Sequence, residues 1–241
     1  METQQTTTGV LSCGRIAPGL IRGARDTGSL LLGVIPVGIA FGIAARQYGL
    51  SAPEACLMSL LVFAGASQFI GIAMIAAGAG VLEVAITTFF VNLRHAIMTA
   101  SLAIYLRGCP KGLLSLLAFQ TTDETFGLSI TRFASGEADR WYLLAANVII
   151  YATWNATTLA GYMAGELLPE LVSNAMAFAL PAVFLSLLVM ACRDRITVVV
   201  AIFSSALSVA LYLGHVSMGN VILVAIAGAT LGMVVEQWKG R

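Results

Sequence analysis

Residues 81–106 read VLEVAITTFFVNLRHAIMTASLAIYL, an apolar run that carries polar and charged groups near its middle. A membrane-spanning helix needs about 20 largely apolar residues, and this run is long enough. Arg94 and His95 lie inside it, and Asn92 precedes Arg94 by two residues. An ionised side chain at the bilayer centre costs about 2.5–3.5 kcal/mol on insertion scales, and such groups usually serve a substrate path, an ion path or a proton relay. The run therefore predicts a transmembrane helix with a functional site near its centre.

Apolar segments of similar length recur along the whole chain. Of the 241 residues, 59% are hydrophobic and 10% are charged, whereas a soluble domain has about 25% charged residues. The segments exceed the ~10-residue strands of membrane β-barrels, so helices are expected. We predict an all-α, polytopic transmembrane bundle over residues 28–241, after a cytoplasmic tail at residues 1–27. About eight hydrophobic segments form it: 28–45, 55–79, 81–106, 112–131, 141–165, 173–192, 196–213 and 217–235.

Composition also argues against several functional classes. The net charge of +1 gives no basic surplus for binding nucleic acid. The four cysteines are scattered without a CxxC pair, so neither a disulfide framework nor a metal site is expected. The sequence has no GxxxxGKS or GxxxxGKT loop, and we do not expect it to hydrolyse ATP. The expectation is a membrane protein that is not an enzyme, needs no cofactor and lies in the lipid bilayer.

Basic residues in short connections indicate the cytoplasmic ends of membrane segments. They place the N-terminus in the cytoplasm and fit eight spans at most connections. Arg107 and Lys111 are exceptions, because an eight-span bundle places them outside. Either an early segment is not a full span, or one is re-entrant. The basic residues that fit are Arg15, Arg22, Arg25, Arg132, Arg140, Arg193, Arg195, Lys239 and Arg241.

Three segments contain residues that disfavour a continuous helix. A proline removes one helical hydrogen bond and clashes with the preceding turn. We expect interruptions at Gly33–Gly38, Gly65–Gln68 and Leu180–Pro181; the alternative is a kink that neighbouring helices absorb. Phe63–Ser67 also resembles Phe203–Ser208. The first three and last three segments could thus form an inverted repeat, an arrangement found in many secondary transporters.

A second charged cluster, Thr121-Thr122-Asp123-Glu124, lies in the next apolar segment. The planar guanidinium of Arg94 suits a carboxylate, either from a substrate or from one of these acids in a structural ion pair. Carboxyl groups removed from water, like imidazole, can bind and release protons near neutral pH. We assign proton coupling to His95, Asp123 and Glu124, with Asp123 as the partner of Arg94 and Glu124 as the titrating group. The alternative places both acids in a cytoplasmic loop.

The remaining candidates suit a substrate that is charged at one end and apolar at the other. An interruption at Gly65–Gln68 would expose amide groups that could hold a carboxylate, as helix N-termini hold anions. The alternative is an ordinary helix in which Ser67 bonds to its own backbone. Phenylalanines near these motifs would contact an apolar tail. The predicted substrate-binding residues are Ser67, Gln68, Asn92, Arg94, Phe63, Phe69 and Phe126.

In order and spacing, these motifs resemble the AzlC-type permeases, the large subunits of branched-chain amino acid exporters, which include YgaZ-type proteins. The resemblance runs from about residue 15 to the end of the sequence. It implies export of leucine, isoleucine, valine or close analogues across the bacterial inner membrane, with a small membrane subunit of the AzlD type. It also implies Asn or Asp at position 92, and asparagine there cannot relay protons. The stretches that carry the resemblance are Gly33–Pro36, Phe41-Gly42, Phe63–Phe69, Asn92–His95 and Thr122–Phe126.

The leading hypothesis is a proton-coupled secondary transporter that exports branched-chain or similar apolar amino acids. One alternative is an intramembrane serine protease with a Ser67–His95 dyad, in which Gln68 replaces the glycine that follows the serine in rhomboid-type enzymes. A second alternative is a structural membrane subunit that transports nothing, whose polar clusters only hold helices together.

Overall fold

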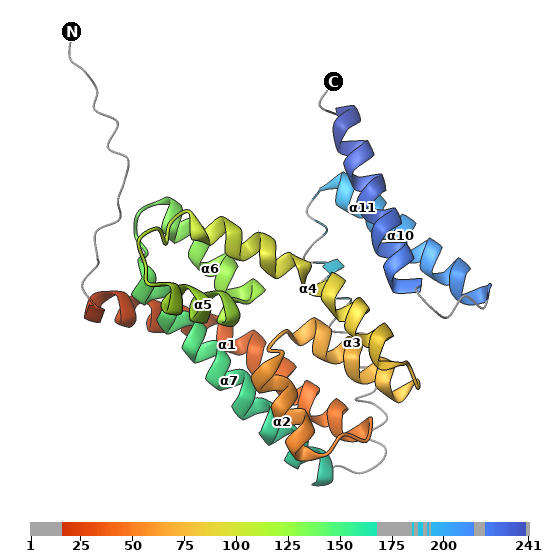
Figure 1. The fold of residues 1–241 in the computed structure, drawn as a ribbon, viewed down its shortest axis with the longest axis horizontal. Helices are drawn as coiled ribbons and strands as arrows, with labels where there is room; N and C mark the ends of the chain where they lie inside the picture. The colour runs from red at the N-terminus through yellow and green to blue at the C-terminus, as the bar shows by residue number, and fades with distance from the viewer. Residues whose placement is uncertain are drawn as a thin grey trace.

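The computed structural model describes residues 16–167, 194–214 and 220–239, with Leu185, Leu188, Val189 and Cys192 between them. The elements in these residues are helices (Figure 1). They are α1 (Ile16–Gln47), α2 (Ala52–Leu61), α3 (Gly65–Ala76), α4 (Val81–Ala103), α5 (Lys111–Gln120), α6 (Asp123–Ala134), α7 (Arg140–Leu167), α10 (Arg195–Leu213) and α11 (Asn220–Lys239).

A helical membrane bundle, as the sequence predicts, is confirmed. Within the described residues, four helices are long and apolar enough to cross a membrane, namely α1, α4, α7 and α10. Large apolar side chains on α4 and α10 face outward, including Phe89, Ile97 and Ile202. An outward apolar surface is stable in lipid, because lipid tails solvate it as well as a protein core does.

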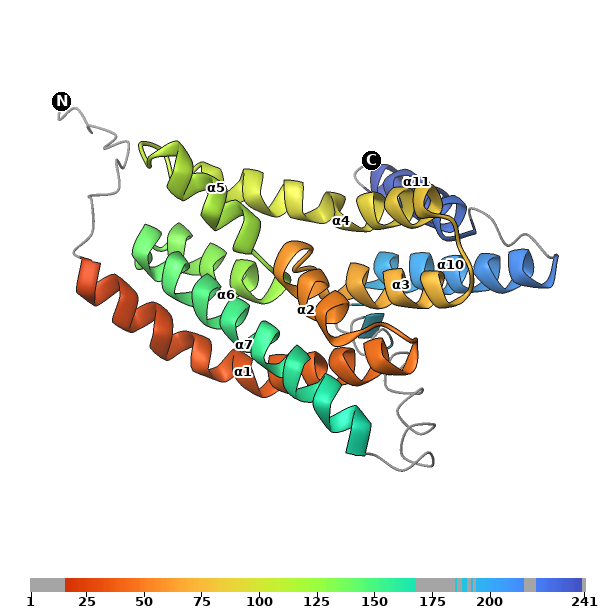
Figure 2. The same cartoon turned by 60° about the horizontal axis from the view of Figure 1, so that its bottom comes forward.

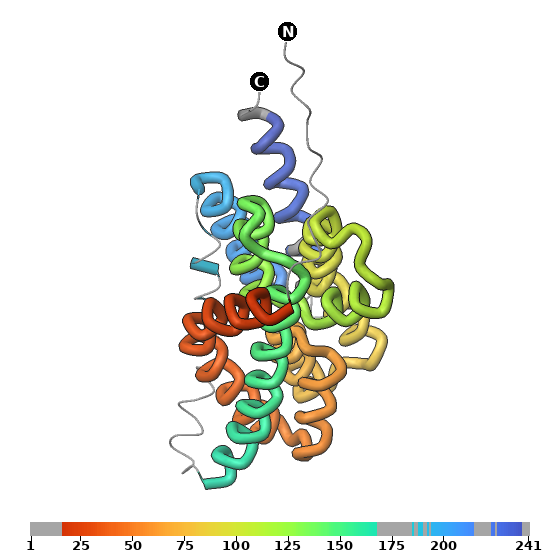
Figure 3. The backbone as a smooth tube through the Cα atoms, turned by 90° about the vertical axis from the view of Figure 1, so that its left-hand side faces the viewer, coloured from red at the N-terminus to blue at the C-terminus, as the bar shows by residue number. Residues whose placement is uncertain are grey.

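The helices α1 and α7 lie side by side and run in the same direction (Figures 2 and 3). Glycines let their backbones approach closely. A Cβ atom on Gly161 would lie 2.1 Å from the carbonyl oxygen of Ile39, and one on Gly42 would lie 2.1 Å from that of Thr158. These glycines thus pack two helices of the same chain against each other.

Replacing Gly161 by alanine is therefore expected to destabilise the bundle. A methyl group there meets fixed backbone, and overpacking of this kind costs about 1–3 kcal/mol. Thermal unfolding of the purified protein in detergent should show a clear fall in Tm. Gly33→Ala is the matched control, because a Cβ on Gly33 has nothing within 4 Å. Equal melting of Gly161→Ala and wild-type protein would contradict this packing.

The helix α1 continues through Pro36, so the predicted interruption at Gly33–Gly38 is wrong. A proline removes only one backbone hydrogen bond from a helix. The neighbouring α7 packs along the length of α1 and holds it together across this point. Residues of the predicted tail from Ile16 to Thr27 form the first turns of α1.

The predicted segment 55–79 is a helical hairpin rather than one span. Its first helix, α2, begins near the C-terminal end of α7, where the Tyr162 hydroxyl donates to the carbonyl oxygen of Leu50 at 2.9 Å. It ends half-way along α7, where the Tyr151 hydroxyl donates to the carbonyl oxygen of Leu60 at 2.8 Å. The helix α2 thus enters the bundle from one end and stops near its middle.

The chain turns back at residues 62–64. Phe63 has a φ of 43° and Ala64 is extended, which breaks the helix just before Gly65. The returning α3 packs against α2, and a Cβ on Gly71 would lie 3.0 Å from the Met58 side chain. Gly65–Gln68 is consequently the first turn of a new helix, and the interruption precedes it.

The predicted segment 112–131 is a second hairpin, which enters from the opposite end. Its first helix, α5, follows α7 towards the middle: Asn147 Nδ2 donates to the carbonyl oxygen of Leu117 at 3.0 Å, and the rings of Phe119 and Tyr151 lie 6.1 Å apart. The second helix, α6, returns to the N-terminal end of α1 and α7, where Arg132 pairs with Asp26 at 3.0 Å.

The two hairpins belong to an inverted arrangement within residues 16–134. The helix α1 is followed by α2–α3, and the antiparallel α4 is followed by α5–α6 (Figure 2). The paired helices match in length, with 10 residues in α2 and α5 and 12 in α3 and α6. The predicted repeat instead paired the first three segments with the last three, and its Leu180–Pro181 motif lies outside the described residues.

The hairpin α2–α3 explains the two exceptions, Arg107 and Lys111: it does not cross the bundle, so α4 runs back towards the end at which α1 begins. Arg107 and Lys111 lie where α4 connects to α5. This connection is at the same end of the bundle as the start of α1 and the α6–α7 connection, because Leu106 packs with Ala138 and Tyr142. We call this the basic end. As the first of the two explanations for Arg107 and Lys111 requires, the early segment 55–79 does not cross the bundle as one helix. The basic residues described at this end are Arg22, Arg25, Arg107, Lys111, Arg132 and Arg140.

The helices α10 and α11 pack on each other and touch the rest of the described structure mainly at α4. Gly228 of α11 lies against Ser204 of α10, where a Cβ would approach the serine hydroxyl to 2.5 Å. Gly228 thus allows α10 and α11 to pack closely.

Candidate functional site

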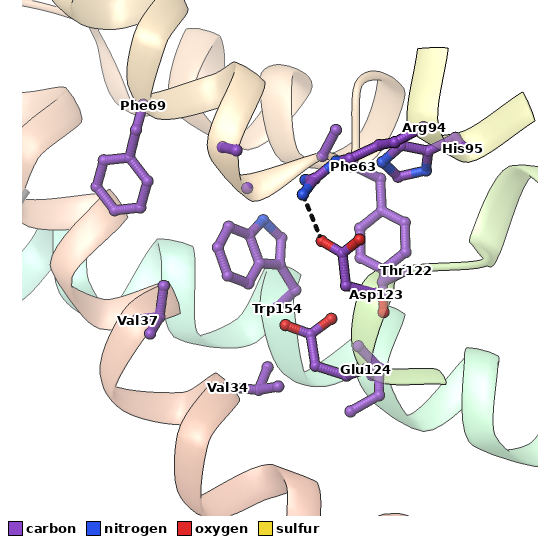
Figure 4. Close-up of a pocket in the computed structure, with 14 residues that line it drawn as sticks. Val34, Val37, Phe63, Phe69, Arg94, His95, Thr122, Asp123, Glu124 and Trp154 are labelled. Carbon is purple, nitrogen blue, oxygen red and sulfur yellow. Dashed lines mark ion pairs between the residues drawn. The ribbon is translucent and has the colours of Figure 1, made fainter. Parts of the chain in front are cut away.

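The tips of the two hairpins meet beside α1, α4 and α7 and enclose a cavity of about 100 Å³ (Figure 4). This volume suits a small solute, since the pockets that bind drug-sized ligands measure about 300–1,000 Å³. One wall is charged and polar, and the other is apolar. The residues that line it are Val34, Val37, Phe63, Ala64, Gly65, Ala66, Phe69, Arg94, His95, Thr122, Asp123, Glu124, Ile150 and Trp154.

An ion pair joins α4 to the tip of α5–α6. Arg94 Nη1 lies 2.7 Å from Asp123 Oδ2, which confirms the predicted pairing. Both side chains retain access to the cavity, with exposed fractions of 37% and 43%. A guanidinium has five N–H donors, so this contact leaves others for a second carboxylate. Arg94 can therefore hold Asp123 and still offer donors to an anionic ligand.

The start of α6 places both acids in the cavity. Thr122 is extended and caps the helix, because its hydroxyl accepts from the Thr125 amide and Thr125 Oγ1 accepts from the Thr122 amide. Asp123 and Glu124 follow in the first turn, where the helix dipole favours negative charge. The carboxylate of Glu124 points into the cavity near Trp154 (Figure 4). In the part of the chain that the structure describes, Glu124 has no ion-pair partner.

The start of α3 faces the same cavity with a different chemistry. Ala64 occupies the capping position and offers no side-chain acceptor to the first amide groups of α3. Such amide groups and the helix dipole favour an anion. Gly65 and Ala66, which line the cavity, bring only small side chains to this position. Together with Arg94, the start of α3 forms the electropositive part of the site.

The opposite wall is apolar and comes from α1, α3 and α7. Phe69 and Ile150 are buried, and Trp154 is 7% exposed, with its indole ring facing the cavity (Figure 4). Val34 and Val37 of α1 complete this wall. The cavity thus presents a cation, two carboxylates and an apolar surface within one small volume.

His95 connects α4 to the end of α5. Its Nδ1 lies 3.2 Å from the carbonyl oxygen of Thr121. A carbonyl oxygen only accepts hydrogen bonds, so this contact requires a proton on Nδ1. The ring also lines the cavity, next to Arg94. His95 is therefore positioned both to fix the tip of α5–α6 and to contact a ligand.

Four of the predicted substrate-binding residues lie outside the cavity lining. The Ser67 hydroxyl donates to Asn92 Oδ1, which joins α3 to α4. Gln68 is fully buried and bonded to Ser59 and Trp154. Phe126 packs against the apolar cluster at the basic end. The predicted site residues that do line the cavity are Phe63, Phe69, Arg94, His95, Asp123 and Glu124.

Sequence reasoning missed the apolar wall from α1 and α7. Val34, Val37, Ile150 and Trp154 sit in ordinary apolar segments, where nothing local distinguishes a wall residue from a core residue. A tryptophan within an apolar segment is the one signal that points to this wall, because its indole N–H needs an acceptor when it is buried. Gln68 supplies that acceptor to Trp154 at 3.0 Å. Thr122 lines the cavity but is not among the predicted site residues.

Comparisons of sequence relate the chain to known membrane proteins. Residues 29–168 match the family model described as AzlC protein. An uncharacterized membrane protein of Archaeoglobus fulgidus is 34% identical over 214 residues, which cover 88% of this chain and 91% of that protein. The inner membrane protein YgaZ of Escherichia coli is 29% identical, with coverage of 93% and 95%. The branched-chain amino acid transport protein AzlC of Bacillus subtilis is 26% identical, with coverage of 65% and 61%. No solved structure matches the chain.

The matched region contains both hairpins and each residue that lines the cavity. It covers more than half of the 241 residues. The shared region is therefore the part of the fold that builds the site, and the chain belongs to the AzlC family of membrane proteins.

Proposed function

We propose that this protein is a secondary transporter that exports branched-chain amino acids or close apolar analogues, driven by protons. The observation that carries the proposal is the composition of the cavity, which combines Arg94, two carboxylates and an apolar wall. An amino acid with an aliphatic side chain has the complementary groups. The printed name of the Bacillus subtilis relative, a branched-chain amino acid transport protein, supports the same substrate class.

Each part of the substrate has a matching part of the site. The substrate carboxylate would bind Arg94 and the start of α3, since both favour an anion. The ammonium group would bind Asp123 or Glu124. The branched side chain would lie against Trp154 and Ile150. In this arrangement the carboxylate competes with Asp123 for Arg94, so binding would loosen the contact between α4 and the tip of α5–α6.

The inverted arrangement of the two hairpins supports alternating access. The hairpin α2–α3 enters from one end of the bundle and α5–α6 from the other, and their tips share one cavity. Movement of one tip would open the cavity to one side only. Binding near the midplane between inverted elements is a common design of secondary transporters.

We place the protein in the bacterial inner membrane with its N-terminus in the cytoplasm. The clustering of basic residues at the basic end supports this orientation, because cytoplasmic connections carry an excess of Lys and Arg. The proposed partner is a small membrane subunit of the AzlD type.

The two alternatives are less well supported. In a Ser67–His95 dyad the hydroxyl would bond to the imidazole, but Ser67 donates to Asn92 and His95 contacts Thr121. Labelling by a serine-directed fluorophosphonate, lost in Ser67→Ala, would support the protease. A purely structural subunit would not need a cavity with unused donors and a carboxylate.

The deciding experiment is efflux from proteoliposomes preloaded with labelled leucine. Three kinds of vesicle are compared: one contains this chain, one contains the small partner, and one contains both. Efflux from each is measured in the presence and in the absence of a pH gradient. The proposal expects efflux faster than from empty vesicles and faster again with a gradient. No transport in any combination, including reconstitution with the partner, would favour the structural subunit.

Substrate selectivity should follow the apolar wall. One methylene in a hydrophobic pocket changes affinity by about 1–3 kcal/mol, or roughly 10–200-fold. Leucine, isoleucine, valine and methionine are therefore expected to compete with one another, whereas glycine should compete poorly for lack of a side chain. Competition against labelled leucine measures this order. Efficient displacement by lysine or glutamate would contradict it, because a charged side chain would lie against Trp154 and Ile150.

A further inference from the structure

We infer that Trp154 limits the size of the substrate side chain and that Gln68 is the residue that positions it. This inference rests on the proposed function and assigns its selectivity to one indole ring. It depends on three observations: where Trp154 lies, what holds its N–H group and what prevents the ring from retreating.

Trp154 lies where the apolar wall meets the charged wall. In Figure 4 its ring is between Phe69 and Val37 on one side and the carboxylates of Asp123 and Glu124 on the other. A substrate whose ammonium group binds either carboxylate would direct its side chain towards this ring. The indole is the largest side chain on the apolar wall, and the space it leaves decides which side chains fit.

A chain of buried hydrogen bonds fixes the indole. Trp154 Nε1 donates to Gln68 Oε1 at 3.0 Å, and Gln68 Nε2 donates to Ser59 Oγ at 2.9 Å. Ser59 Oγ and Thr158 Oγ1 share a further hydrogen bond of 2.8 Å. Gln68, Ser59 and Thr158 are fully buried. Because each partner is bonded in turn, the ring has one favoured orientation relative to the tip of α2–α3.

Close packing prevents the ring from moving away from the cavity. Phe41 is fully buried and stacks behind it, with ring centroids 6.1 Å apart and an interplanar angle of 22°. Gly65 lies at the edge of the ring, where a Cβ would be 3.0 Å from Trp154 Cη2. A larger substrate cannot displace the indole into either neighbour, so the cavity keeps its size.

The test compares phenylalanine with leucine in wild-type protein and in Trp154→Phe. The smaller ring frees space next to the substrate side chain, and the phenylalanine-to-leucine ratio of transport or binding should rise about 10-fold or more. Trp141→Phe is the matched control, since Trp141 does not line the cavity, and its ratio should stay at the wild-type value. An unchanged ratio in Trp154→Phe would overturn the inference.

Two Gln68 variants test the positioning role. Gln68→Leu removes the acceptor for Trp154, so the ratio should rise as in Trp154→Phe, through a change in KM rather than in kcat. Gln68→Glu keeps an oxygen towards the indole and should restore the wild-type ratio. If Gln68→Leu lowers kcat alone and leaves the ratio unchanged, Gln68 is only structural.

Fluorescence supplies a readout that does not need transport. With Trp141 and Trp238 replaced by phenylalanine, Trp154 is the remaining tryptophan. Its emission should change in a saturable way as leucine is added, and an unchanged emission while labelled leucine binds would overturn the inference. If wild-type protein neither binds nor transports leucine, the proposed function fails instead.

Discussion

Replacing Arg94 by lysine is expected to reduce leucine transport about 10- to 100-fold while the protein still inserts into the membrane. Lysine keeps the positive charge but loses the planar fork that can hold Asp123 and a substrate carboxylate together. A hydrogen bond to a charged group contributes about 1.5–3 kcal/mol, which corresponds to this range. Initial rates of leucine efflux from proteoliposomes with equal amounts of protein measure the effect.

Arg107→Lys is the matched control for this substitution. Arg107 lies in the connection between α4 and α5, away from the cavity, and its replacement should leave the rate unchanged. Transport at the wild-type rate in Arg94→Lys would exclude the role of Arg94 as a carboxylate clamp. If Arg94→Ala fails to accumulate in the membrane at all, the ion pair with Asp123 is mainly structural.

The sequence predicted where the helices lie better than which segments cross the bundle and which turn back inside it. Length and apolar composition identified α4, α7 and α10 within a few residues, because a span must exceed about 20 residues. The same criteria merged α2 with α3 and α5 with α6, since each pair is about as long as one span. The basic pair Arg107 and Lys111 carried the missing information, because it contradicts any arrangement in which each early segment crosses.

The charged half of the site was predictable, and the apolar half was not. Arg94, Asp123 and Glu124 stand out because charge in an apolar segment is costly. Ser67 and Gln68 are uncharged polar residues in an apolar run, and their polar groups form hydrogen bonds that join helices. Whether a polar residue of α3 lines the cavity or joins helices depends on which face of α3 meets the cavity. A helix with apolar neighbours on every side has no hydrophobic periodicity that would identify this face. Trp154 and Val34 come from distant helices and are brought together only by the packing of α1 on α7.

The second large effect is expected at the carboxylates. Proton coupling requires a group that is protonated in one part of the cycle and ionised in another, and Arg94 stays protonated throughout. The structure pairs Arg94 with Asp123 and leaves Glu124 directed into the cavity. Glu124→Gln keeps the size of the side chain and removes its titration. It should abolish leucine efflux driven by a pH gradient and preserve exchange of leucine at equal concentrations on both sides.

Asp123→Asn should behave differently, because it leaves Arg94 without its ion-pair partner. Breaking a buried pair costs about 3–5 kcal/mol, but these side chains are 37% and 43% exposed, so the loss of stability should be smaller. Substrate affinity should change more than coupling, since Arg94 then binds the substrate carboxylate without competition. Glu83→Gln at the far end of α4 is the matched control and should change neither property. Gradient-driven efflux that survives both Asp123→Asn and Glu124→Gln would remove the carboxylates from the coupling mechanism and leave His95, beside Arg94 in the same cavity, as the remaining titratable group.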